Sequence, residues 1–148
     1  MNRIKGNTGA LLLFIGTIVI TASFVLSLIL SILGLGGVGE LAAKAIIDAG
    51  GTQSDADLAR QFAFITAIVV LVISSVVALL VIIPGFKYSL QGKAKTWAFV
   101  MAILEIISVV TNIIYNITSI TGLISTLVGA IGAILYIIGV FMLRKQEA

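Results

Sequence analysis

One carboxyl group is the strongest candidate for chemistry in this sequence. Glu105 is the only charged residue in the apolar stretch 96–143. At about 1.5 Å of helix rise per residue it lies roughly 14 Å from the start of that stretch, near the middle of a hydrocarbon core about 30 Å thick. A central Asp, Lys or Arg costs about 2.5–3.5 kcal/mol on insertion scales, so such groups are usually protonated, paired or exposed to a wet cavity. Glu105 is therefore a candidate proton or cation site.

Four polar residues share a helix face with Glu105. At 100° per residue, Ser108, Asn112, Tyr115 and Asn116 fall within about 80° of it. This stripe runs from the middle of the membrane to its outer surface. It predicts an outward-opening half-cavity that ends at the carboxyl group.

A second interpretation of Glu105 is structural. A neutral Glu105 can hydrogen-bond to a neighbouring helix, with Asn112 joining helices in the same way, and such bonds contribute about 0.6–2 kcal/mol each. The predicted spans contain no second charge, whereas proton relays generally use several titratable groups. This lack of a partner charge favours the structural interpretation.

Most enzymatic chemistry lacks its side chains here. The sequence contains no His and no Cys, which removes H-E-x-x-H zinc sites, Ser–His pairs and thiol nucleophiles. No two aspartates lie within the apolar stretches to form an acid–base dyad. We therefore expect no enzyme activity, no cofactor and no metal.

Composition identifies the solvent of this 148-residue chain as lipid. Hydrophobic residues make up 60% of the chain and charged residues 10%, with a mean hydropathy of +1.26. Soluble domains have about 45–50% hydrophobic residues and about 25% charged residues. Disorder and a disulfide scaffold are excluded by the apolar content and the absence of Cys. The net charge of +3 comes from scattered residues, so no nucleic-acid partner is expected.

The apolar runs predict an all-α protein, a single membrane domain over 1–148 built as a four-transmembrane-helix bundle. Pro84 and Gly85 end the second run, and a polar cluster at 116–119 divides the last one. The expected helices cover about 10–34, 55–83, 95–115 and 119–143, with an outer loop at 35–54 and an inner loop at 84–94.

The outer loop is expected to contain a short helix. It opens with the glycine-rich segment 34–37, and Glu40, Lys44 and Asp48 follow at the four-residue spacing that supports a helix over about 39–49. Ser54 and Asp57 predict a capping box that starts the next helix. The short helix is either a surface cap on the bundle or a docking element for another protein.

Basic residues predict that both termini are cytoplasmic. Seven of the nine lie before the first span, between the second and third, or after the fourth: Arg3, Lys5, Lys87, Lys93, Lys95, Arg144 and Lys145. Small size and Ile-rich spans favour the plasma membrane of a bacterium. The alternative of a cleaved signal peptide fits poorly, because the first apolar run exceeds the 7–15 residues of a signal core. The inner loop is expected to anchor at the headgroups, since a specific lipid site needs four or more clustered basic residues.

Small residues recur at helical spacing and predict close helix packing. They are Gly16, Ser23, Ser27 and Ser31 in the first span, and Gly122, Gly129, Gly132 and Gly139 in the fourth. The spacing fits contacts within one chain and contacts in a homo-oligomer equally well.

Residues 91–145 resemble small bacterial four-helix integral membrane proteins of unknown function. The resemblance lies in a basic loop that enters an apolar hairpin at 92–97, a glycine-punctuated run at 128–135, and a closing Arg144-Lys145. It implies architecture and no particular activity.

These features predict a non-enzymatic small multi-pass membrane protein that binds another membrane component, as an accessory subunit or a toxin-immunity protein. The alternative is a small oligomeric channel or transporter protomer that uses Glu105. The expected partners are the lipid bilayer and either a membrane protein or a second copy of the chain.

Overall fold

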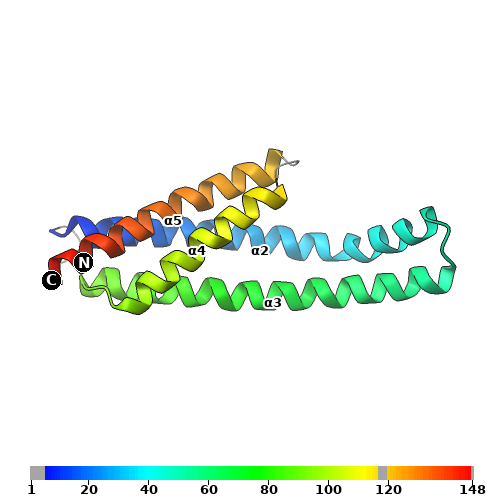
Figure 1. Cartoon of the computed structure of the whole chain (residues 1–148), viewed down its shortest axis with the longest axis horizontal. Coiled ribbons are helices and arrows are strands. Elements are labelled where there is room, and N and C mark those ends of the chain that lie inside the picture. Colours follow the sequence, from blue (N-terminus) through cyan, green and yellow to red (C-terminus); the bar gives the residue numbers. More distant parts are fainter. Residues whose placement is uncertain (1–5, 117–119, 148) are drawn as a thin grey trace. The chain divides into compact units, whose positions relative to one another are not determined.

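The chain is helical throughout the part that the computed structural model describes. Residues 6–116 and 120–147 are described, with the side chains at 112, 115, 116, 120–122, 125 and 147 outside the described set. Over these residues the helices are α2 (Thr8–Asp48), α3 (Gln53–Gln91), α4 (Thr96–Asn116) and α5 (Ile120–Glu147) (Figure 1). The all-helical prediction is confirmed. The predicted turn at 116–119 falls mostly outside the described residues.

Three of the helices are long and apolar enough to cross a membrane. They are α2, α3 and the segment Thr126–Gln146 of α5. The apolar part of α4 is shorter, at Thr96–Thr111, whereas a perpendicular crossing takes about 20 residues.

The predicted outer loop at 35–54 is wrong, because α2 continues without a break to Asp48. The glycines at 34–37 were expected to open a loop, since glycine costs up to about 1 kcal/mol relative to alanine in a helix. Unpaired amides in hydrocarbon cost several kcal/mol each, so an apolar segment keeps its helical hydrogen bonds despite its glycines. The separate helix at 39–49 is therefore the last part of α2.

A four-residue connection joins α2 to α3. Gly50 has a φ of 84°, and the amides of Gly50 and Gly51 donate to the carbonyls of Ile47 and Ile46, both at 2.9 Å. This is the Schellman arrangement, in which a left-handed glycine satisfies the last carbonyls of a helix.

The capping box of α3 lies two residues before the predicted Ser54–Asp57 pair. The Asp55 amide donates to the Thr52 hydroxyl at 3.2 Å, and the Thr52 amide donates to the Asp55 carboxylate at 3.1 Å. Because α2 ends at Asp48 and the glycine turn at Gly50 and Gly51 follows, Thr52 is the first capping residue that the chain reaches. The hydrogen bonds from Thr52 lower the pKa of Asp55.

Helix α3 continues through Pro84 to Gln91, so the prediction that it ends at Pro84 is also wrong. Proline lacks the amide that would bond to the carbonyl four residues earlier, which weakens the helix locally. Neighbouring helices can supply donors to the backbone near such a site. Here the Tyr136 hydroxyl of α5 donates to the Val81 carbonyl at 3.1 Å in a buried position, one residue after Leu80, whose carbonyl loses its amide partner at Pro84. The inner loop shrinks to the four residues 92–95, and it starts at Gly92, with a φ of 64°.

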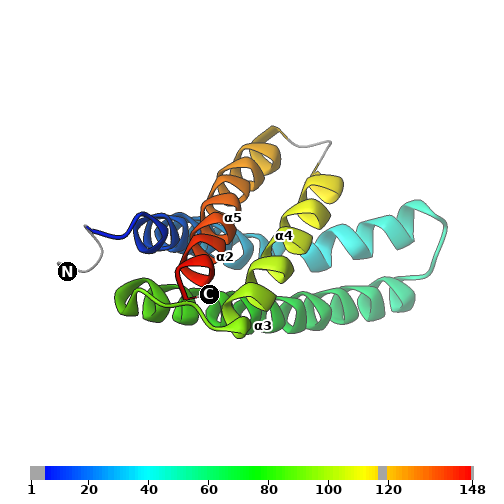
Figure 2. The same ribbon diagram turned by 60° about the vertical axis from the view of Figure 1, so that its left-hand side comes forward.

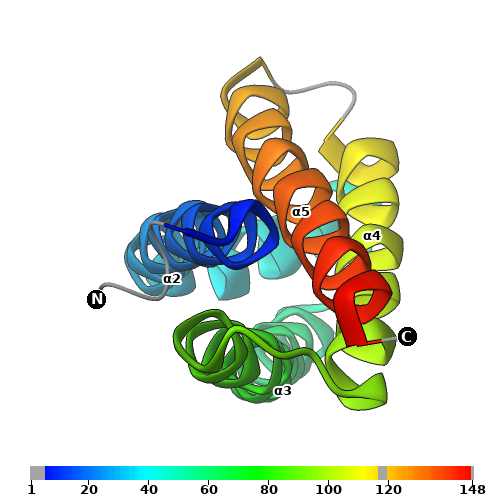
Figure 3. The same ribbon diagram turned by 90° about the vertical axis from the view of Figure 1, so that its left-hand side faces the viewer.

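The chain divides into two compact units. Unit 1 comprises Met1–Val25 and Ala78–Ala148, and unit 2 comprises Leu26–Val77. In unit 1, α4 and α5 pack as a hairpin, and α5 also lies against the first part of α2 (Figures 2 and 3). The largest fully buried side chains all belong to unit 1: Tyr136, Leu13, Leu143, Val81, Val140, Thr17 and Ser89.

Candidate functional site

Glu105 lies on the face of α4 that packs into the core of unit 1. Ala98 and Ala102, which precede it by seven and three residues, are fully buried. Glu105 itself is half-buried. Its side chain forms no hydrogen bond or ion pair with any residue that the structure describes, although it lies within electrostatic reach of Tyr136 on α5. The carboxyl group therefore faces neighbouring helices and not the outer surface of α4.

Of the four residues that extend the predicted polar stripe from Glu105, only Ser108 has a described side chain. Ser108 is exposed, and so is Thr111, whose hydroxyl donates to the Ile107 carbonyl of its own helix at 2.8 Å. Asn112, Tyr115 and Asn116 continue α4, but their side chains lie outside the described set. Within the described part of α4, Glu105 is thus the polar residue closest to the core.

The contact between α2 and α5 is made by glycines from both helices. A Cβ atom added to Gly16 would lie 2.6 Å from the Tyr136 nitrogen and 2.9 Å from the Gly132 oxygen. One added to Gly132 would lie 3.0 Å from side-chain atoms of Val19 and Ile20. Such distances leave no space for a side chain, so both backbones touch directly, as small residues allow in membrane helices.

The same contact extends along both helices in antiparallel register. A Cβ atom on Gly139 would lie 2.7 Å from the Leu13 Cα and 2.8 Å from the Gly9 oxygen. At the other end, a Cβ atom on Gly129 would lie 3.4 Å from the Ser23 hydroxyl. Four of the predicted packing glycines and Ser23 therefore lie in one α2–α5 seam.

Two predicted packing residues lie elsewhere. Ser27 and Ser31 belong to unit 2 and are exposed. Gly122 lies in the first turn of α5, outside the set of described side chains.

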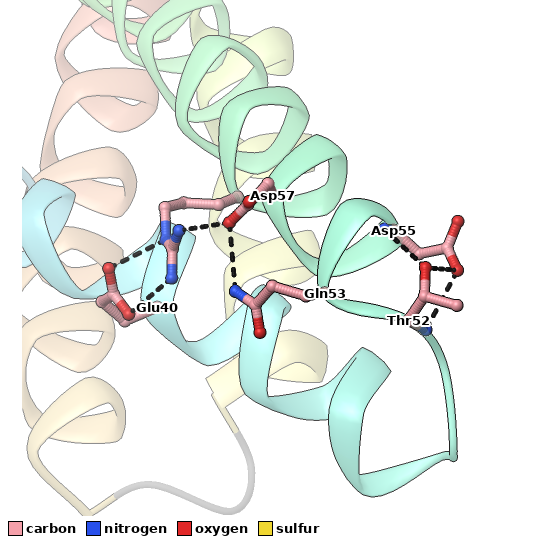
Figure 4. A network of polar contacts seen from close by, with 6 residues as sticks. Glu40, Thr52, Gln53, Asp55 and Asp57 are labelled. Atoms are coloured by element: carbon pink, nitrogen blue, oxygen red, sulfur yellow. Dashed lines mark hydrogen bonds and ion pairs between the residues drawn. The ribbon is translucent and has the colours of Figure 1, made fainter.

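In unit 2, the last part of α2 and the first part of α3 form a hairpin joined by an ionic cluster. Arg60 Nε lies 2.9 Å from a Glu40 oxygen, and Arg60 Nη1 lies 2.8 Å from an Asp57 oxygen. Gln53 also donates to Asp57, at 3.4 Å (Figure 4). The contact with Glu40 raises the pKa of Arg60. Gly39 permits this approach, because a Cβ atom there would lie 2.8 Å from the Arg60 Cγ.

The rest of unit 2 presents large apolar side chains. Between 26 and 38 on α2 and between 62 and 77 on α3, no residue is buried. The half-buried positions on α3 recur every four residues, which marks the ridge that faces α2. They are Ala63, Ala67, Leu71 and Ser75. Each helix therefore uses one narrow ridge within this unit and leaves most of its perimeter to other contacts.

Comparisons with protein-family models, with curated proteins and with solved structures find no match to this chain. Among the described residues, no group of three or more acidic side chains could hold a metal ion.

Sequence reasoning missed the contacts around Pro84. A Cβ atom on Gly85 would overlap the Thr17 hydroxyl oxygen and lie 2.7 Å from the Tyr136 ring. Tyr136 is fully buried, and its hydroxyl reaches the backbone of α3. The sequence did contain one indication of these contacts, a proline inside an apolar run. A proline leaves a backbone carbonyl without its amide, and a neighbouring helix can supply a donor.

Proposed function

We propose that this chain is a multi-pass membrane protein that acts by binding a transmembrane helix of another membrane protein, as accessory and toxin-immunity subunits do. The observation that supports this most directly is a ridge on α2 formed by Ser27, Ser31 and Gly34, all of which are exposed. At 100° per residue the three positions lie within about 60° of one another. We call this set the serine ridge.

The serine ridge differs from the surface around it. The neighbouring exposed side chains of α2 are large and apolar: Leu26, Ile29, Leu30, Ile32 and Leu33. Hydrocarbon solvates large apolar side chains well, whereas small residues favour close approach of a second helix backbone. The ridge therefore fits a partner helix better than it fits lipid.

The hydroxyl groups of the ridge also favour a partner. Thr17, Thr21 and Ser75 each donate to the carbonyl four residues earlier, at 2.7, 2.7 and 2.8 Å. Ser27 and Ser31 form no hydrogen bond with any described residue. A hydroxyl without an acceptor in hydrocarbon is costly, and an interhelical hydrogen bond contributes about 0.6–2 kcal/mol. A partner helix with an acceptor at this depth would satisfy both groups.

The proposal includes the orientation expected from the sequence, with both termini cytoplasmic and the chain in the plasma membrane of a bacterium. Basic residues at the ends of the chain and at 87–95 support cytoplasmic termini. The Glu40–Arg60–Asp57 cluster of unit 2 would then face the exterior.

Site-specific photocrosslinking tests the serine ridge. A photoreactive amino acid at Ser31 is expected to give one discrete protein adduct in native membranes, because a partner helix covers this position. The matched control is the same amino acid at Leu33, which is 76% exposed and points about 200° away on the same helix. Equal protein adducts from both positions, or none from Ser31, would contradict the proposal.

A second candidate function is a small oligomeric channel or transporter protomer. It is favoured by Glu105, which faces the interior of unit 1 without a hydrogen-bonding partner among the described residues. A crosslinked adduct at twice the mass of the chain would support this oligomeric alternative over binding of a different protein.

A further inference from the structure

The structure gathers basic side chains at one end of unit 1. Lys93 and Lys95 lie in the connection between α3 and α4, and Lys87 lies near the end of α3. Arg144 and Lys145 lie in the last turn of α5. The Arg144 guanidinium carbon lies 5.4 Å from the centroid of the Phe99 ring, one turn after Lys95 on α4. We call these five basic residues the basic end.

Two further contacts show that the helix ends meet. Asn7, just before α2, donates to the Gln146 side chain of α5 at 2.8 Å. A Cβ atom on Gly92, at the end of α3, would lie 3.9 Å from the same Asn7 nitrogen. The start of α2 and the ends of α3 and α5 are thus neighbours, and the Arg144–Phe99 contact adds the start of α4.

The charge of the basic end is largely uncompensated. All five side chains are exposed, and none forms an ion pair with a described residue. The only acidic side chain described in unit 1 is Glu105, in the middle of α4. At this end the helix dipoles cancel, because the starts of α2 and α4 each contribute about half a positive charge and the ends of α3 and α5 each contribute about half a negative charge. Glu147 is the last residue of α5 and adds one negative charge, so the five basic residues leave a net positive charge of about four.

Aromatic residues place the basic end at the level of lipid headgroups. Trp97 follows Lys95 by two residues and is 49% exposed. Phe99 and Phe141 lie beside Arg144, with ring centroids 6.5 Å apart. Tryptophan concentrates at the interface between hydrocarbon and water.

We propose that the basic end binds the phosphate groups of anionic phospholipids. The inner loop expected from the sequence contains three lysines, and the fold adds Arg144 and Lys145 from α5. The resulting five basic residues exceed the minimum of four that such sites use. Anchoring by aromatic rings alone would give no preference between lipid classes.

Trp97 is the single tryptophan of the chain and therefore reports on the lipids beside the basic end. The full chain is reconstituted in mixed vesicles of zwitterionic and anionic phospholipid, with bromine on the acyl chains of only one class at a time. At equal mole fraction, brominated anionic lipid is expected to quench Trp97 severalfold more effectively than brominated zwitterionic lipid. Equal quenching by the two classes would overturn the proposal.

Lysine substitutions and high salt distinguish binding through charge from anchoring by aromatic rings. The combined Lys93→Gln, Lys95→Gln and Lys145→Gln variant is expected to lose the anionic preference, while replacement of the same lysines by Arg retains it. Lys44→Gln, in unit 2, is the control and leaves the preference unchanged. Without any substitution, raising the salt from 0.1 to 1 M shortens the Debye length from about 10 to about 3 Å and weakens the preference. A preference that survives both changes would overturn the proposal.

The same experiment shows whether the bound phosphate belongs to a lipid or comes from solution, and whether the chain is inserted in the vesicle. Millimolar inorganic phosphate is expected not to displace the anionic lipid, and displacement would indicate a site for soluble phosphates instead. This inference depends on membrane insertion and not on the serine ridge. A chain that does not float with vesicles would overturn both proposals, whereas equal quenching of an inserted chain would leave partner binding standing.

Discussion

The Gly139→Ala substitution is expected to destabilise the protein by about 1–3 kcal/mol, the usual cost of overpacking. The added methyl group would lie 2.7 Å from the Leu13 Cα and 2.8 Å from the Gly9 oxygen, so it meets backbone on α2 that cannot move aside alone. Helices in lipid gain little from apolar burial on association, and backbone contact is their main source of stability. We therefore expect the substitution to weaken the packing of α2 against α5.

Gly36→Ala is the matched control for this change. Gly36 is helical, and a Cβ atom added there meets nothing within 4 Å. Alanine is expected to stabilise the helix by about 0.5–1 kcal/mol. Reversible unfolding of both variants in the same detergent measures the two free energies. Similar changes in both would show that the α2–α5 seam does not hold unit 1 together.

Tyr136→Ala is expected to cost about 3–5 kcal/mol, the range for a buried aromatic side chain. Tyr136 is fully buried, and its ring also contacts the backbone at Gly85. Tyr136→Phe keeps the ring and removes the donor to the Val81 carbonyl. Its expected cost is about 1–2 kcal/mol, because the buried Val81 carbonyl loses this donor.

Tyr88→Phe controls for the loss of a hydroxyl group. Tyr88 is buried in the same unit, and its hydroxyl donates to no described residue. Its substitution is expected to change the free energy of unfolding by less than about 0.5 kcal/mol. If Tyr88→Phe and Tyr136→Phe destabilise equally, the hydroxyl of Tyr136 has no special role at the proline.

The sequence predicts both the helical class and most of the α2–α5 seam, because both follow from the residue types that suit a helix in lipid. Apolar composition determines that the chain needs helices, and glycines at helical spacing can serve little purpose except close packing. Gly16, Gly129, Gly132 and Gly139 are found in that seam.

The helix ends were harder to predict because local rules were derived for chains in water. The glycines at 34–37 and Pro84 are breakers in water, yet both lie inside long helices here. Near Pro84 the Val81 carbonyl accepts a hydrogen bond from Tyr136, which is 52 residues further along the sequence than the proline, and no local pattern contains this contact.

The candidate site was only partly predictable. The position of Glu105 within an apolar helix follows from the sequence, but the direction of its side chain depends on which face of α4 packs, and that face is set by Ala98 and Ala102. The sequence predicts that the five residues of the basic end lie on one side of the membrane, but it does not show that the inner loop lies close to the last turn of α5.

We expect the chain to cross a membrane with both termini in the cytoplasm. Because the chain has no cysteine, single-cysteine variants report their own location without background. In intact cells, a membrane-impermeant maleimide is expected to label Lys44→Cys at once, and to label Lys93→Cys only after the membrane is permeabilised. Labelling of Lys93→Cys from outside, or equal labelling of both variants before permeabilisation, would contradict the claim.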